Sequence, residues 1–144
     1  MQTACEERRW AEQEFGRAEL NDPRRVQRLI QMAAQAARHP AGLVTAVFDK
    51  PSEREAAYRL LENPCVSAQA LGDAAHRACA LRAAEYDYVF LGTDGSSLHL
   101  SDPDELKGFG TIGSRERGAR GLKVLSVQAV SPFGVPLGLL AQQY

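Results

Sequence analysis

Asp94 is the residue of this sequence best placed for metal-assisted chemistry. It follows Tyr88-Val89-Phe90-Leu91, a short apolar run of mostly aromatic and β-branched side chains, which is typical of a strand buried on both faces. A carboxylate at the end of such a strand is held in a fixed position, as metal-assisted catalysis requires. Because Asp94-Gly95 is also a common hairpin sequence, a plain turn is the alternative interpretation, and the residues alone favour it slightly.

A nucleophilic site is a second possibility at the same place. Ser96, Ser97 and His99 follow Asp94 and could supply a nucleophile and a base. No Gly-x-Ser-x-Gly sequence surrounds either serine. Alternation along a strand would place Ser97 and His99 on one face and Ser96 on the other. A small serine hydrolase is therefore the least favoured alternative.

The second candidate site is a cluster of arginines at the start of a predicted helix. Asn21-Asp22-Pro23 supplies a capping residue followed by proline at the first helical position, which predicts a helix from Arg24 to about Arg38. Arg24, Arg25 and Arg28 lie in its first two turns, where the helix dipole disfavours positive charge. Arginines there could contact phosphate groups, and side chains at the start of a helix can enter the major groove of DNA. The alternative is an ordinary solvated helix face.

The distribution of charge is more informative than its total. The formal charge is −1, so the chain as a whole is not basic, yet fourteen of its seventeen cationic residues are arginine, which favours bidentate contact with phosphate or carboxylate. Residues 85–106 carry only acidic charges, whereas 107–123 is basic and glycine-rich and includes Arg115, Arg117 and Arg120. A cationic loop beside Asp94 would attract phosphate, and an ordinary surface loop is the alternative.

Apolar periodicity predicts an α+β fold in two parts. Residues 1–84 have the pattern of a helical bundle, with helices expected at 6–20, 24–38, 52–62 and 68–85, the third opened by a capping box at Ser52-Glu53-Arg54-Glu55. Residues 85–144 have the pattern of a three-stranded antiparallel meander, with strands at 86–91, 122–130 and 135–142. Pro136 marks the last of these as an edge strand, because proline cannot donate to a ladder.

Cysteine content and hydropathy restrict the compartment. The three cysteines are far apart in the sequence, which indicates neither a disulfide framework nor a zinc knuckle and fits a reduced cytosol. No apolar run approaches the ~20 residues that span a bilayer, and the first residues lack a signal-peptide core. The sequence therefore predicts a soluble cytoplasmic protein with no membrane partner.

Three segments together resemble a known family. They are Leu20–Leu29 with its Asn-Asp-Pro-Arg-Arg sequence, Glu55–Ser67 with Ala-Tyr-Arg-Leu-Leu-Glu-Asn-Pro, and Thr93–Leu98 with Thr-Asp-Gly-Ser-Ser. Their order and spacing resemble the N-terminal third of Tn-five-type bacterial cut-and-paste transposases, of the insertion-sequence-four family, across essentially the whole chain. The second segment is the most specific of the three.

The resemblance implies a DNA-binding protein that recognises transposon ends. It implies that 1–84 is a helical domain that grips double-stranded DNA and that 85–144 begins a ribonuclease-H-like (RNase H-like) catalytic core. Contact with DNA carries over to the arginines of the helix that follows Asp22. Less closely matched members of the same surface are Arg38, His39 and Arg59.

The resemblance also implies an Asp-Asp-Glu (DDE) catalytic set in which Asp94 is the first acid. In the family, three acids hold two Mg²⁺ or Mn²⁺ ions, and two such ions need several carboxylates. Counterparts of the other two acids do not occur before Tyr144. The expectation is an incomplete core that binds no metal tightly and cannot cut DNA unaided.

Two further expectations concern partners. An open strand edge and an apolar sheet face would promote self-association, and a protein-interaction module that uses this edge is the alternative to DNA binding. A transposase-like protein would be associated with the bacterial nucleoid.

Overall fold

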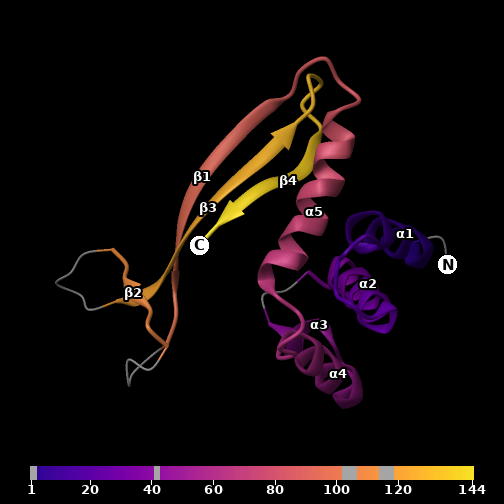
Figure 1. The fold of residues 1–144 in the computed structure, drawn as a ribbon, viewed down its shortest axis with the longest axis vertical. Helices are drawn as coiled ribbons and strands as arrows, with labels where there is room; N and C mark the ends of the chain where they lie inside the picture. Colours follow the sequence, from indigo (N-terminus) through magenta and orange to yellow (C-terminus); the bar gives the residue numbers. More distant parts are fainter. Residues whose placement is uncertain (1–2, 41–42, 102–106, 114–118) are drawn as a thin grey trace. The chain divides into compact units, whose positions relative to one another are not determined.

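The computed structural model describes residues 3–40, 43–101, 107–113 and 119–144 (Figure 1). These residues form helices followed by an antiparallel sheet, so the predicted α+β class is confirmed. The chain divides into two compact units, Met1–Ala78 and Cys79–Tyr144. The division into domains after residue 84 stays a prediction.

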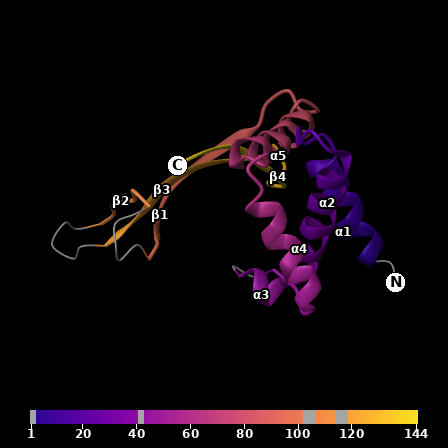
Figure 2. The same ribbon diagram turned by 60° about the horizontal axis from the view of Figure 1, so that its bottom comes forward.

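The first unit contains α1 (Thr3–Phe15), α2 (Pro23–Arg38), α3 (Val44–Val47), α4 (Pro51–Leu61) and most of α5 (Ala68–Ala83). Figure 2 shows α1 and α2 packed side by side. None of the helices in the described part of the chain is long and apolar enough to cross a membrane.

Local sequence explains where α2 begins and ends. The Oδ1 of Asp22 accepts a hydrogen bond from the Arg24 N–H at 2.9 Å, and Pro23 occupies the first helical position, where no N–H is needed. Asn21 has φ +56°, in the left-handed region that asparagine tolerates better than most residues. The helix ends at Arg38, and the N–H of His39 donates to the Gln35 carbonyl at 3.0 Å. Both predicted ends of this helix are confirmed.

The start of α4 differs from the prediction. The helix begins at Pro51, its N-cap residue is Lys50, and no side chain caps it. The capping box predicted at Ser52 is therefore wrong, because the preceding proline already sets the first helical turn and places Ser52 inside the helix. Glu53 instead lies 3.7 Å from the Lys50 ammonium group. A side chain does cap α5, since Ser67 Oγ accepts from the Ala70 N–H at 3.0 Å.

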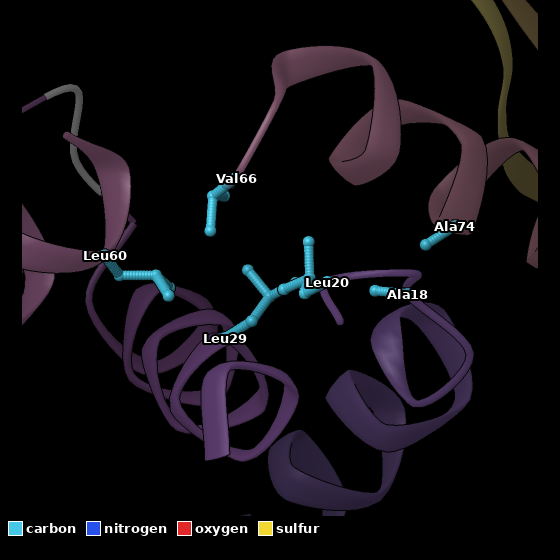
Figure 3. Close-up of a cluster of buried hydrophobic side chains, with 6 residues drawn as sticks. All are labelled: Ala18, Leu20, Leu29, Leu60, Val66 and Ala74. Carbon is cyan, nitrogen blue, oxygen red and sulfur yellow. The ribbon is translucent and has the colours of Figure 1, made fainter. Parts of the chain in front are cut away.

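One face of α2 is buried in the core of the first unit. Leu29 joins a cluster with side chains from the α1–α2 connection, α4, the α4–α5 connection and α5 (Figure 3). The cluster consists of Ala18, Leu20, Leu29, Leu60, Val66 and Ala74. Ile30 and Ala34 join a second cluster with Ala11 of α1. Ala37, near the end of the same helix, is exposed. Because the apolar side of α2 is used by the core, its opposite side faces solvent.

The second unit is built on an antiparallel sheet. Its strands are β1 (Phe90–His99), β2 (Gly110–Thr111), β3 (Arg120–Val130) and β4 (Pro136–Gln143). β3 pairs with β1 on one side and with β4 and the short β2 on the other. The predicted meander of three strands corresponds in order to β1, β3 and β4, but the first strand, predicted at 86–91, shares only residues 90–91 with β1. The last residues of α5 contribute Cys79 to a buried cluster with Ala129 and Leu137.

The prediction of a first strand buried on both faces is wrong. β1 begins at Phe90, and all ten of its residues are exposed, including Phe90 at 57% and Leu91 at 56%. Among the described residues only β3 pairs with it, so apolar composition alone did not bury it. Asp94 lies within β1, opposite Ser126, and neither follows the strand nor forms a turn. Pairing with β3 holds the Asp-Gly-Ser-Ser sequence extended against its local turn preference.

Candidate nucleic-acid interface

Most of the polar side chains of α2 lie on one side of the helix. At about 100° per residue, six of them fall within an arc of about 100° on the helix. They are Arg24, Gln27, Arg28, Gln31, Gln35 and Arg38, and we call this surface the polar face of α2. Gln35 is half-buried and the others are exposed. The helix contains no acidic residue, so this face is cationic and rich in amides.

Arg24 is anchored at the N-terminal end of the polar face. Its Nε and NH2 atoms donate to the two carboxylate oxygens of Asp22 at 3.2 and 3.1 Å. The hydrogen bonds from Arg24 hold the pKa of the Asp22 carboxyl below its usual value and raise the pKa of the guanidinium. The Arg24 side chain is 91% exposed, so it remains accessible to a phosphate beyond this pair.

The lowered pKa of Asp22 gives a pH-dependent contribution to stability. The Asp22 carboxylate takes up a proton at a higher pH in the unfolded chain than in the folded chain. Its contribution to the stability of the fold is therefore complete above pH 3.8, the ordinary pKa of the group, and is lost as the pH falls through the lower pKa of the folded state. Asn caps a helix about as well as Asp, so Asp22→Asn removes mainly the charge. We expect a lower thermal unfolding midpoint for this variant at neutral pH and a difference from wild type that shrinks below pH 3.8. A difference independent of pH would contradict this assignment.

Arg25 does not lie on the polar face. It is about 100° round the helix from Arg24, is half-buried, and its NH1 donates to the Leu20 carbonyl at 2.8 Å. This hydrogen bond ties the connection between α1 and α2 to the first turn of α2. The geometry therefore gives Arg25 a structural role, and its predicted contact with DNA has no support from its position.

Arg28 lies one turn after Arg24 on the polar face and lines a cleft. The cleft has a volume of about 250 Å³, and its lining comprises Arg8, Arg28, Gln31, Met32, Ala34, Gln35, Arg38, Phe48 and Glu53. Within the residues that the structure describes, Arg28 makes no hydrogen bond or ion pair. Its charge is therefore not neutralised by a neighbouring acid, unlike the charge of Arg24.

The remaining predicted DNA contacts are at the far end of α2 and on α4. Arg38 lies 3.6 Å from Glu7 of α1, and its side chain is 36% exposed. His39 follows it, exposed, at the C-terminal cap. Arg59 pairs with Glu55 one turn earlier on α4 and is not among the residues that line the cleft. The structure thus brings Arg24, Arg28 and Arg38 onto one face and leaves Arg59 on another helix.

The predicted cationic loop can be described only at its end. Arg115 and Arg117 lie outside the described residues. Arg120 is the first residue of β3, is half-buried, and donates from NH1 to the Phe109 carbonyl at 3.2 Å. At least part of its hydrogen-bonding capacity therefore serves the sheet.

Asp94 does not form a metal site with its described neighbours. It accepts a hydrogen bond from Ser96 Oγ at 3.0 Å, and its cross-strand partner is Ser126. No group of three His, Cys, Asp or Glu side chains suited to a metal ion occurs in residues 3–40, 43–101, 107–113 and 119–144. A pair of Mg²⁺ or Mn²⁺ ions needs several carboxylates, so these residues alone do not fit one.

The hydrolase alternative is not supported by the geometry of β1. Alternation places Asp94 and Ser96 on one face of the strand and Ser97 and His99 on the other. An acid, a base and a nucleophile are therefore not brought together.

The sequence reasoning missed the glutamines of the polar face. Gln27, Gln31 and Gln35 recur at every fourth residue of a predicted helix, and this spacing is a readable signal for a shared face. Arg8 of α1, which lines the cleft, was also missed, because only the packing of α1 on α2 brings it there.

Comparison with known proteins finds a family match within the helical region. Residues 7–66 match the family model described as Transposase DNA-binding. The matched segment contains α2 with its whole polar face, the lining of the cleft and α4, and ends before Asp94. It supports a transposase-like DNA-binding function with DNA as the partner.

Proposed function

We propose that this chain is the N-terminal part of a cut-and-paste transposase of the Tn-five type. In this proposal, the helical unit binds the double-stranded DNA of transposon ends through the polar face of α2. The observation that carries the proposal is the placement of three arginines and three glutamines on one accessible side of a helix within the segment matched at 7–66.

The dimensions of this face suit the major groove. From Arg24 to Arg38 the helix rises about 21 Å, and a major groove about 12 Å wide admits an α-helix. Arg24 and Arg38 lie near its two ends, where a straight helix in a curved groove comes closest to the phosphate backbones. Guanidinium groups there would fix the position and register of the protein on the duplex.

The charge balance implies moderate rather than strong electrostatic binding. Asp22 and Glu7 lie beside Arg24 and Arg38 and offset part of their charge, whereas Arg28 has no such partner within the described residues. Glu53 adds a carboxylate to the cleft. Affinity for DNA of any sequence should therefore depend on only a few phosphate contacts.

The catalytic part of the proposal rests on the resemblance. Asp94 would be the first acid of a ribonuclease-H-like core, on a strand paired antiparallel with β3. Mg²⁺ or Mn²⁺ would require further carboxylates, and no metal-dependent step is assigned to the described residues. Binding to DNA and cutting of DNA are therefore separate properties of this proposal, and binding is the one that the helical unit supports.

The test is the salt dependence of binding to a labelled duplex. Each phosphate contact contributes about −0.9 to the slope of log K against log salt, so we expect a slope of up to about −3 between about 50 and about 200 mM salt. A membrane-filter or anisotropy titration of the full chain measures it. An absence of binding, or an affinity independent of salt, would refute the proposal.

A further inference from the structure

We propose that Gln31 and Gln35 read the DNA sequence, each by a bidentate hydrogen-bonded contact with an adenine in the major groove. This inference rests on the proposed function, because it requires that the polar face of α2 lie in that groove. It assigns a task to two residues that contribute no charge and that the resemblance to transposases did not single out.

Their position on the helix is the first support. Gln31 lies at the midpoint of the polar face and Gln35 lies one turn further on, so both stand between Arg28 and Arg38. A straight helix in the major groove approaches the base edges most closely at its middle and the backbones at its ends. The two amides are therefore placed for bases, and the flanking guanidinium groups are placed for phosphates.

The second support is that both amides are available. In the part of the chain that the structure describes, neither side chain hydrogen-bonds to the protein, whereas Gln69 of α5 donates to Asp73 at 2.7 Å. Both line the cleft beside Arg28. Gln35 is half-buried there, which limits its conformational freedom and reduces the entropy lost on binding.

The third support is the charge of the cleft. Glu53 lines it together with the two glutamines. A carboxylate there repels a phosphate but tolerates the amino groups that bases present, so the centre of the cleft suits base edges better than backbone. A glutamine amide can accept from adenine N6 and donate to adenine N7 at once, which other bases do not allow in the same way.

The spacing defines the expected site. Four residues of helix rise about 6 Å, close to two steps of about 3.4 Å along the duplex. For a helix that lies along the groove, the preferred site would contain two adenines about two base pairs apart. Each contact should discriminate against the wrong base by about 5- to 150-fold, which corresponds to about 1–3 kcal/mol.

The experiment selects bound duplexes from a pool with a randomised central region. The full chain should enrich two adenine positions, Gln31→Ala should lose the preference at one of them, and Gln35→Ala at the other. Gln31→Glu should change the first preference from adenine to cytosine, because a carboxylate accepts from cytosine N4. A purely structural role of Gln31 would not produce that change. Gln13→Ala, an exposed glutamine on α1, is the matched control and should leave the selected site unchanged.

The outcomes separate this inference from the function on which it rests. Salt-dependent binding without any enriched sequence, or enrichment of the same adenines by both alanine variants, overturns the reading of bases and leaves DNA binding intact. Failure of the full chain to bind any duplex overturns both. Alanine favours helix formation, so loss of folding is not expected for the alanine variants, and circular dichroism confirms this for each protein.

Discussion

Arg28→Ala should weaken binding to duplex DNA of any sequence by about tenfold at about 0.1 M salt and reduce the salt slope by about one. Arg28 is exposed, lies one turn after Arg24 on the polar face, and has no hydrogen bond or ion pair within the described residues. Its full charge is therefore available to a phosphate. Removing it should also leave the fold intact, because no hydrogen bond or ion pair among the described residues is broken. Titrations at several salt concentrations measure both quantities.

The control for Arg28 is an arginine of equal charge on another helix. Arg77 lies on α5, outside the matched segment, and its NH2 is 3.4 Å from the Glu19 carboxylate. Arg77→Ala removes this exposed guanidinium. It should change the salt slope much less than Arg28→Ala does. If both variants lost affinity equally, the effect would reflect total charge, and the polar face of α2 would not be the binding surface.

Features governed by neighbouring residues were predictable from the sequence. The ends of α2 follow from Asp22, Pro23 and Pro40, and the start of α5 follows from Ser67, because caps and proline act within one helical turn. The order of the long strands was also predictable, because turn residues separate short apolar runs. These signals act between residues close in the sequence, so tertiary packing did not alter the structures that they predict.

Features that depend on distant contacts were not predictable. Asp94 lies inside a strand because β3 pairs with it, although its own sequence favours a turn. Arg25 and Arg28 carry the same charge in the sequence, but their surroundings differ. Arg25 donates a hydrogen bond to the Leu20 carbonyl and has a structural role, whereas Arg28 is exposed. The cleft requires residues of α1, α2 and α4, and no local pattern indicates which side chains meet there.

Leu60→Ala should destabilise the helical unit by about 2–5 kcal/mol, the range for a buried leucine truncated in a close-packed core. Leu60 is 5% exposed and contributes to the cluster that includes Leu20 and Leu29 (Figure 3). Because Leu29 lies on the inner side of α2, a cavity beside it should also loosen the helix that carries the polar face. We therefore expect earlier unfolding in urea together with weaker DNA binding near the unfolding transition.

The neighbouring residue provides a matched control for this prediction. Leu61 is on the same helix and undergoes the same change of side chain in Leu61→Ala, but it is 46% exposed. Its truncation should cost under about 1 kcal/mol, because less apolar surface is buried and no closed cavity is formed. Equal losses from the two variants would show that Leu60 is not in the core described above. The difference between adjacent leucines thus measures how firmly the core holds α2 in place, and with it the arginines and glutamines that the proposed function requires.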